Sequence, residues 1–266
     1  MKLLCIGDDF AFTRAVTFGI IDAIDYGILR NTGIFINSEW AEMAIDLIKE
    51  RPHVCLGIDF NLVAGKPVSN PKDIPHLVDE NGDFHKSTYY VNQEQYNTEE
   101  GRKELFPYDE VRIEIRAQYN KFLKLVGKEP GYLNMHSIIP ETYDQAIEEI
   151  HQETNIPRYE QIVKKYKIKE LYDFVGISYS EKKEFDVKWQ LEKNMIPEVF
   201  KHSKEMLSEE YVHIICHPGY VDAQLVDNTT LSIERMRDAE FYMSPDIKKW
   251  VEDNDVELIT FYGLVD

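Results

Sequence analysis

Short apolar runs alternate with amphipathic segments of helical length along most of this chain. The run KLLCIG (2–7) precedes a segment in which Val16, Ile20 and Ile24 recur at helical spacing. Because parallel strands need crossover connections and helices supply them, this alternation predicts a mostly parallel sheet. About seven such units in one domain favour a TIM-barrel-like (β/α) barrel over an open sheet.

The same pattern gives the expected elements. Strands are expected at 2–7, 33–37, 53–62, 132–139, 174–179, 212–217 and 256–263. Helices are expected at 13–29, 38–50, 110–127, 141–151, 159–167, 188–207 and 231–253. Residues 63–108 break the alternation and are rich in Pro, Asn, Gly and Tyr. Because long loops inside compact domains are usually functional, we expect a loop insertion within a single domain that spans residues 1–266.

Charge and cysteine content narrow the partners and the compartment. The formal net charge is −18, and an acidic surface repels phosphate backbones and anionic lipids, so nucleic acid and membranes are not expected as partners. Cys5, Cys55 and Cys216 each lie in an apolar run, which is typical of buried thiols in a reducing compartment. No run approaches the ~18 apolar residues of a spanning helix. We therefore expect a cytoplasmic protein.

Polar residues that end the expected strands are candidate site residues, because ligands of parallel α/β folds collect at the carboxyl ends of strands. Taken singly, most have an ordinary explanation: an aspartate after a strand commonly forms a turn or caps a helix, and a lone histidine is more often a core residue than a ligand. Together, oxygen and imidazole donors at one edge predict a divalent metal site. The candidates are Asp8, Asp9, Asp59, Asn61, Asn134, His136 and His217, with Asp222 further on.

Asp59 is the candidate hardest to explain as a turn residue. It lies inside the apolar run VCLGIDFNL, and a buried carboxylate needs a partner or a metal. Asp8 and Asp9 pose a different problem, because successive side chains of a strand point to opposite faces. For both carboxylates to reach one substrate the chain must bend at the strand end, and the segment GDDF, which begins at Gly7, permits such a bend.

Five segments, in order along the chain, resemble those of a known family. They are LLCIGDDFAFTRAVTFGIIDAIDYGIL, GIFINSEWAEMAIDLIKERPHVCLGIDFNLVAGKPV, IPHLVDENGDF, NMHSIIPE and CHPGYVD. Together they resemble the YdjC-like (ChbG) carbohydrate deacetylases from the first expected strand to the last. The resemblance implies a distorted (β/α) barrel, a divalent metal ion and a homodimer. It also implies hydrolysis of the N-acetyl group of short amino-sugar chains such as chitobiose or its phosphate.

The resemblance gives a role to five candidates. Asp9 matches the family's metal-binding aspartate, and Asp8 matches its neighbour, the general base. His136 matches a histidine that we expect to bind the metal, and His217 matches the histidine of the family's HP motif, which we expect to be the general acid. Asp59 stands where the family typically has a metal-binding histidine, in a segment that here reads GIDFN.

This last departure bears on the metal. A set of Asp9, Asp59 and His136 is harder and more anionic than one with two histidines, so it favours Mg²⁺ or Mn²⁺ over Zn²⁺. Later histidines of the family are replaced around Ile138 and Pro140. In addition, an asparagine stands at position 134 where the family has an aspartate.

These residues predict a metal-dependent deacetylase in which Asp8 takes a proton from water and His217 protonates the departing nitrogen. Substrate contacts are expected from Asn61, from Tyr89 of the insertion, and from Arg158, which matches a family arginine near the substrate. Two alternatives stay open. A glycoside (phospho-disaccharide) hydrolase would need carboxylates on both sides of the glycosidic bond. A catalytically silent carbohydrate-binding protein would use the aromatic insertion for affinity alone.

Overall fold

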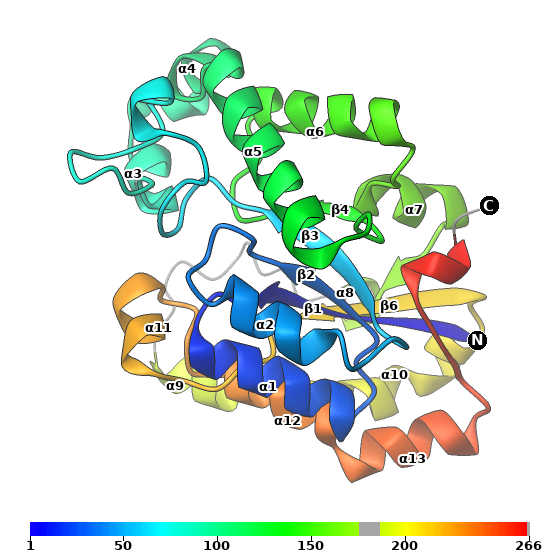
Figure 1. Cartoon of the computed structure of the whole chain (residues 1–266). Coiled ribbons are helices and arrows are strands. Elements are labelled where there is room, and N and C mark those ends of the chain that lie inside the picture. Colours follow the sequence, from blue (N-terminus) through cyan, green and yellow to red (C-terminus); the bar gives the residue numbers. More distant parts are fainter. Residues whose placement is uncertain (176–186, 265–266) are drawn as a thin grey trace.

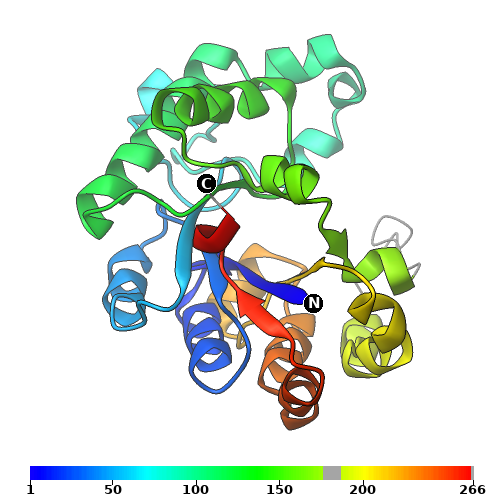
Figure 2. The ribbon, with the colours of Figure 1, turned by 90° about the vertical axis from the view of Figure 1, so that its right-hand side faces the viewer.

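One curled parallel sheet forms the centre of the computed structural model, which describes residues 1–175 and 187–264 (Figures 1 and 2). The strands follow the order β4-β3-β2-β1-β6-β5, and β7 pairs with β1. All of these pairs are parallel. The predicted distorted barrel of mostly parallel strands is therefore confirmed, as a curled half-barrel. The strands are β1 (Lys2–Phe10), β2 (Asn31–Ile34), β3 (Cys55–Phe60), β4 (Leu133–Met135), β5 (Lys169–Glu170), β6 (Tyr211–Cys216) and β7 (Glu257–Ile259).

Strand β1 is the hub of this sheet. Residues 2–4 pair with β7 and residues 6–10 pair with β2, while residues 2–7 pair with β6. Its apolar residues are buried, which explains why the segment reads as a continuous hydrophobic run. Because β1 is central, its last residues reach the middle of the carboxyl edge of the sheet.

Helices cover the outside of the curled sheet, as Figure 2 shows. The longer ones are α1 (Arg14–Asp25), α2 (Ala41–Ile48), α5 (Tyr108–Val126), α6 (Glu141–Thr154), α7 (Tyr159–Tyr166), α10 (Ile196–Leu207), α12 (Glu234–Met243) and α13 (Pro245–Asp253). The shorter ones are α3 (Ser87–Val91), α4 (Glu99–Leu105), α8 (Leu171–Val175), α9 (Val187–Glu192) and α11 (Ala223–Asn228).

Two predictions of a single long helix are wrong. The predicted helix at 188–207 is divided into α9 and α10, and Pro197 lies in the first turn of α10. The predicted helix at 231–253 is divided into α12 and α13 at Ser244, whose side chain caps α13 directly before Pro245. Apolar periodicity continues across both breaks, but proline lacks the N–H that a helix interior needs and is favoured in the first turn.

The strand predictions differ from the structure in several places. The strands expected at 132–139 and 256–263 are shorter, as β4 and β7, and Phe261–Leu264 form a 3₁₀ helix. The strand expected at 33–37 begins earlier, as β2. In the strand expected at 174–179, Phe174 and Val175 belong to α8, and the remaining residues lie outside the described part of the chain.

The predicted loop at 63–108 contains regular structure. Helices α3 and α4 lie in it, and Thr98 caps α4 by accepting a hydrogen bond from the Gly101 N–H. Its start is fixed to α5 because the buried Glu114 accepts hydrogen bonds from the N–H groups of Val68 and Ser69. We call residues 63–107, up to the start of α5, the insertion. It rests against one end of the sheet (Figure 1).

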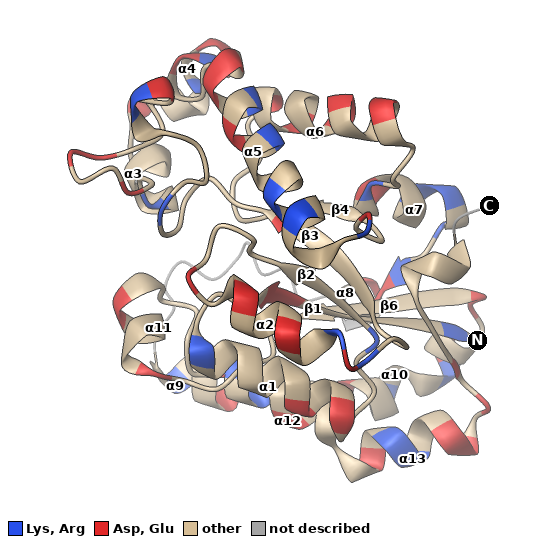
Figure 3. Ribbon diagram, in the orientation of Figure 1, with Lys and Arg blue, Asp and Glu red and all other residues tan. Residues whose placement is uncertain are grey.

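Charged side chains lie mainly on the outer helices, and the acidic end of β1 is an exception inside the fold (Figure 3). Within residues 1–175 and 187–264, no helix has the length and apolar character needed to cross a bilayer.

Candidate metal centre and substrate cavity

The chain bends sharply at the end of β1, as predicted, and the bend lies at Asp9 within the GDDF segment. Asp9 has φ of 69° and Ala11 has φ of 71°, a left-handed backbone conformation that residues other than glycine rarely adopt. The register between β1 and β2 shifts between Gly7 and Phe10. This bulge breaks the alternation of a regular strand, so the buried Asp8 and Asp9 both face the same region.

Asp59 projects from β3 into the same region and is 1% exposed. A glycine on the neighbouring strand makes room for it, because a Cβ atom added at Gly33 would lie 2.9 Å from the Asp59 Cβ. Among the described residues, neither carboxylate oxygen of Asp59 has a hydrogen-bond partner. A buried carboxylate without partners is costly, so the site calls for a cation.

His136 follows directly after β4. Its backbone N–H donates to the carbonyl of Phe60, and its ring packs edge-on against Phe35 with 4.7 Å between ring centroids. Its Nδ1 atom lies 3.0 Å from the Asp9 Oδ1 atom. The next residue, Ser137, has φ of 67°, so the backbone also turns at this strand end. These contacts fix the His136 imidazole beside Asp9.

Asp9, Asp59 and His136 therefore come together from three strand ends. Each offers a ligand atom, and these atoms lie within 4.8 Å of one another. Two carboxylates and one imidazole are donors that suit a divalent cation. The unpartnered Asp59 oxygens supply the independent observation that the set fits such an ion.

The carboxylates strongly perturb one another. Burial, and then the charge of Asp9, raises the pKa of Asp8 to about 8, against the opposing charge of Arg235. Burial, followed by the charges of Asp8 and Asp9, holds the pKa of Asp59 well above its ordinary value. Burial would also raise the pKa of Asp9, but His136 and Arg235 outweigh it and lower that pKa. A divalent cation would relieve this repulsion.

Arg235, on α12, is a site residue that the sequence analysis missed. Its Nη2 atom donates to Asp9 Oδ2 at 2.5 Å, and its side chain is 1% exposed. The guanidinium also lies over the ring of Phe12, 5.6 Å from the centroid. It supplies the positive charge that Asp9 needs in a buried position. The charged run ERMRD suggests an exposed helix, and only the tertiary contact with β1 reveals its role.

His217 follows β6 and is held through its backbone. Its N–H donates to Asp238 Oδ2 at 3.0 Å, and Asp238 Oδ1 lies 2.8 Å from the Nζ atom of Lys193, whose side chain is 7% exposed. Burial lowers the pKa of His217 to about 4, and the charge of Asp9 offsets only part of that effect. The imidazole is therefore neutral at pH 7.

A cavity of about 290 Å³ opens onto this cluster, and we call it the metal-side cavity. Its wall includes four of the five predicted metal or catalytic residues: Asp8, Asp59, His136 and His217. The loop after α11 closes another side with Thr229, Thr230 and Leu231. Lys86, from the insertion, reaches across and donates to the carbonyl of Asp227 at 3.0 Å.

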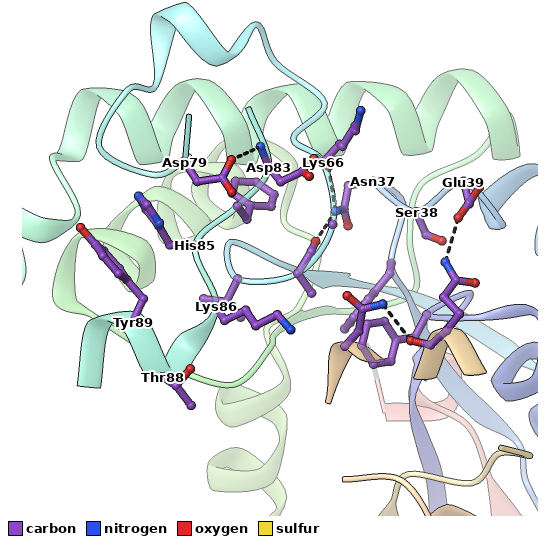
Figure 4. Close-up of a pocket in the computed structure, with 18 of the residues that line it drawn as sticks. Asn37, Ser38, Glu39, Lys66, Asp79, Asp83, His85, Lys86, Thr88 and Tyr89 are labelled. Carbon is purple, nitrogen blue, oxygen red and sulfur yellow. Dashed lines mark hydrogen bonds between the residues drawn. The ribbon is translucent and has the colours of Figure 1, made fainter. Parts of the chain in front are cut away.

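A larger cavity of about 980 Å³ lies beside it, between the insertion, the loop after β2 and α11 (Figure 4). Phe12, Val63, Ala64, Lys86 and Asn228 line both cavities. The two cavities are therefore neighbours with a common wall.

Tyr89, predicted to contact substrate, lines the larger cavity. Its ring stacks on His85 with 3.9 Å between centroids and 12° between planes, and both are labelled in Figure 4. Tyr89 is 48% exposed. It is therefore free to meet a ligand on the part of its surface that His85 leaves open.

Two other predicted substrate residues have structural contacts. Asn61 is fully buried, and its side chain accepts hydrogen bonds from the N–H groups of Val63 and Ala64, which shapes the start of the insertion. Arg158 forms ion pairs with acidic residues of α6, among them Glu148 at 2.8 Å. It lies beside the first residue of β4, whereas His136 follows the last residue of that strand. Neither residue lines the metal-side cavity.

Asn134 lies within the sheet, and Asp222 caps a helix. Asn134 is paired in register with Asp59 across β3 and β4. Asp222 caps α11, with Oδ1 accepting from the Leu225 N–H at 2.8 Å and Oδ2 accepting from the Ala15 N–H at 3.0 Å. This is the ordinary capping role of an aspartate after a strand.

Sequence comparison identifies the class of this protein. The profile of the YdjC-like protein family matches residues 2–253, so the chain belongs to this family. The resemblance seen in the five segments is confirmed.

Individual relatives cover almost the whole chain. Carbohydrate deacetylase 2 of Listeria innocua serovar 6a is 30% identical over 267 residues, which is 99% of each chain. The chitooligosaccharide deacetylase of Proteus mirabilis is 25% identical and covers 99% of this chain and 98% of its own length. A solved structure from Enterococcus faecalis V583, described as a candidate cellobiose-phosphate cleavage protein, has a TM-score of 0.75 at 21% identity. It covers 100% of this chain and 99% of its own, and it shows a shared fold.

Proposed function

We propose that this protein is a metal-dependent carbohydrate deacetylase, which removes the N-acetyl group from short amino-sugar chains. One observation carries the proposal: Asp9, Asp59 and His136 converge beside a cavity whose wall also holds Asp8 and His217. The deacetylase names of the relatives, which align over nearly their full length, support the reaction type.

Asp9, Asp59 and His136 are the proposed ligands of one divalent ion. Their two carboxylates make a hard, anionic set, which favours Mg²⁺ or Mn²⁺ over Zn²⁺. The chemistry that such an ion supplies is polarisation of the amide carbonyl and a lower pKa for bound water. Arg235 holds one oxygen of Asp9, so it fixes the orientation of that ligand.

Asp8 is the proposed general base. It lies next to the ligand set without belonging to it and faces the metal-side cavity. Its pKa of about 8, raised by burial and then by Asp9, leaves it mostly protonated at neutral pH without a cation. A bound cation would lower that pKa, so that Asp8 can take a proton from the attacking water.

His217 is the proposed general acid. Water attacks the acetyl carbonyl carbon, the C–N bond breaks, and the departing nitrogen must gain a proton to leave as an amine beside acetate. Because the pKa of His217 is lowered to about 4 by burial, its imidazole must first gain a proton during the reaction. The proton that Asp8 takes from the attacking water is the one that must reach the imidazole, and both side chains line the metal-side cavity.

The glycoside hydrolase alternative fits the site less well. Such enzymes place two carboxyl groups on opposite sides of the bond they cleave, about 5–9.5 Å apart. Here Asp9 and Asp59 belong to one compact cluster. Asp222 could serve as a more distant second carboxylate, but both of its oxygens accept hydrogen bonds from backbone N–H groups.

Product analysis tests this proposal. The chelated protein, with and without added Mg²⁺, Mn²⁺ or Zn²⁺, is incubated with chitooligosaccharides and their phosphates, and the products are separated. Acetate and free amines are expected only with metal. Sugar units of shorter chain length without acetate would establish the glycosidase instead, and unchanged sugar that still binds would establish the silent binding protein.

The remaining assignments stay predictions. Substrate contact by Tyr89 agrees with its place in the larger cavity, whereas contact by Asn61 or Arg158 has no such support. The identity of the metal, the homodimer and the cytoplasmic location also stay predictions from the sequence.

A further inference from the structure

We infer that two buried residues of the segment 187–193, Gln190 and Lys193, position His217 and Asp9 for the reaction. The segment consists of α9 and the lysine that follows it. Both side chains are in the described part of the chain and lie outside the walls of the two cavities, so they act through other residues. This inference rests on the proposed function, because it extends the machinery that holds the proposed general acid.

Lys193 compensates the charge of the carboxylate that holds His217. The side chain of Lys193 is 7% exposed, and its Nζ atom lies 2.8 Å from Asp238 Oδ1 and 3.0 Å from Asp238 Oδ2. Asp238 is fully buried, and the same Oδ2 atom accepts the hydrogen bond from the His217 N–H. A buried carboxylate without a partner charge is strongly unfavourable. Lys193 therefore lets a charged acceptor face the His217 N–H, and such acceptors make the stronger kind of hydrogen bond.

Lys193 also serves a second acid of α12. Glu234 is fully buried, and its Oε1 atom lies 3.9 Å from the Lys193 Nζ atom. Burial acts to lower the pKa of Lys193, but Asp238 and the other neighbours outweigh it and raise that pKa. The ammonium group is therefore charged at neutral pH, as a partner of two buried acids must be.

Gln190 holds the first turn of α12. Its Oε1 atom accepts hydrogen bonds from the N–H groups of Ser232 and Ile233, at 3.1 and 2.8 Å. Its Nε2 atom donates to the carbonyl of Thr230 at 2.9 Å, and Thr230 lines the metal-side cavity. The N-cap residue of α12 is Ile233, which makes no side-chain cap. Gln190 therefore caps this helix from another segment and ties it to the cavity wall.

Helix α12 passes these contacts on to both halves of the site. Its Arg235 donates to Asp9 Oδ2, and its Asp238 accepts from the His217 N–H. A shift of α12 would thus move a proposed metal ligand and the proposed general acid together. Because reacting groups must be held within about 0.5 Å of the productive geometry, the segment that fixes α12 governs the reaction without touching substrate.

Amide exchange measured by NMR tests the Lys193 contact without turnover. In metal-free Lys193→Met, the His217 N–H should exchange at least about tenfold faster, because a hydrogen bond to a charged acceptor is weakened. Lys201→Met, at an exposed lysine of α10, is the matched control and should leave that rate unchanged. An unchanged His217 rate in folded Lys193→Met overturns the inference, whether or not the protein releases acetate.

Kinetics with the metal-loaded protein show where Lys193 acts. In Lys193→Met, kcat for acetate release from a chitooligosaccharide should fall at least about tenfold. KM and the metal concentration for half-maximal activity should stay the same, because Lys193 lies outside both cavities. A loss that appears only in KM or in the metal midpoint would overturn the inference.

The double variant Lys193→Met/Asp238→Asn keeps the test decisive if Lys193→Met does not fold, because it leaves neither charge of the pair alone. Its kcat and its His217 exchange rate should be no worse than those of Asp238→Asn, since the lysine acts through that aspartate. A further loss in the double variant would overturn the inference. If even the parent protein releases no acetate, the proposed function fails, and the exchange rates still decide the positioning role.

Discussion

The two neighbouring cavities are built in different ways. The acidic part of the metal-side cavity lies at the ends of β1, β3, β4 and β6, and its acids are buried and fixed by backbone bends and by Arg235. The larger cavity is made by the insertion and by surface loops, and its characteristic ring, Tyr89, is half-exposed. Under the proposed function, the central sheet holds the groups that react, and surface segments are left to contact the rest of the substrate.

Asp9→Asn should give the largest effect. It removes one charge from the proposed ligand set and the partner of Arg235, so acetate release should fall on the order of 10³-fold as several kcal/mol of transition-state stabilisation are lost. Acetate release and bound metal are measured together. Asp46→Asn, at an exposed surface ion pair, is the matched control. Retained metal with full activity would remove Asp9 from the site.

Gly33→Ala should give the next largest effect, although Gly33 carries no chemistry. The added methyl group would lie 2.9 Å from the Asp59 Cβ, which is too close, so Asp59 must move. The metal concentration for half-maximal activity should rise at least about tenfold, as when a group that orients a ligand is lost. Gly263→Ala, where an added Cβ atom meets nothing within 4 Å, is the control. An unchanged midpoint in Gly33→Ala would mean that the position of Asp59 is not critical.

A pH dependence of stability tests the electrostatics of the metal-side cavity. An unfolded aspartate has a pKa of about 3.9, but burial, and then Asp9, raises the pKa of Asp8 to about 8, and burial raises that of Asp59. The folded protein therefore keeps protons that the unfolded chain has released, and this stability is lost as pH rises through the folded pKa. His217 and His213, whose pKa burial lowers to about 4, oppose this only below pH ~6.5.

Between about pH 6.5 and 8, the free energy of unfolding of the metal-free protein should thus fall as pH rises, by at most about 2 kcal/mol for each group, and the Tm should fall with it. Thermal unfolding with a chelator measures this, and added Mg²⁺ or Mn²⁺ should flatten the curve. A metal-free Tm that rises across the same window would contradict the assignment of buried, protonated acids.

Arg158→Met should give the smallest effect on activity. Arg158 pairs with Asp144 and Glu148 beside the start of β4, away from the metal-side cavity. The Tm should fall modestly, with about 1–2 kcal/mol of stability lost for a buried group with half-exposed partners, while kcat/KM stays the same. A large loss of kcat/KM at unchanged Tm would restore the substrate role predicted from the sequence.

The strand ends and the outer helices also differ in how well the sequence predicts them. Strand ends were predictable, because apolar runs stop at a polar residue and parallel strands bring those residues together, which placed Asp9, Asp59 and His136 at one edge. The bend in the GDDF segment was anticipated, but the left-handed conformation of Asp9 was not. Backbone strain of this kind depends on the surrounding structure rather than on local propensity.

Arg235 and Asp238 could not be found in this way. Both lie on α12, and Arg235 is 226 residues away from its partner Asp9 along the chain. A charged run on a helix ordinarily indicates a solvent-facing surface. The breaks before Pro197 and Pro245 and the Thr98 cap of α4 were readable, since proline and capping residues carry local signals.

The central claim is that one divalent ion, held by Asp9, Asp59 and His136, is required for deacetylation. A titration of Mg²⁺ or Mn²⁺ into chelated protein, followed by acetate release from a chitooligosaccharide, tests it most directly. The claim predicts no release before metal, saturation at one ion per chain, and a midpoint shifted to higher metal in Asp59→Asn. Full release from the chelated protein, or the same midpoint in Asp59→Asn and the parent protein, would contradict it.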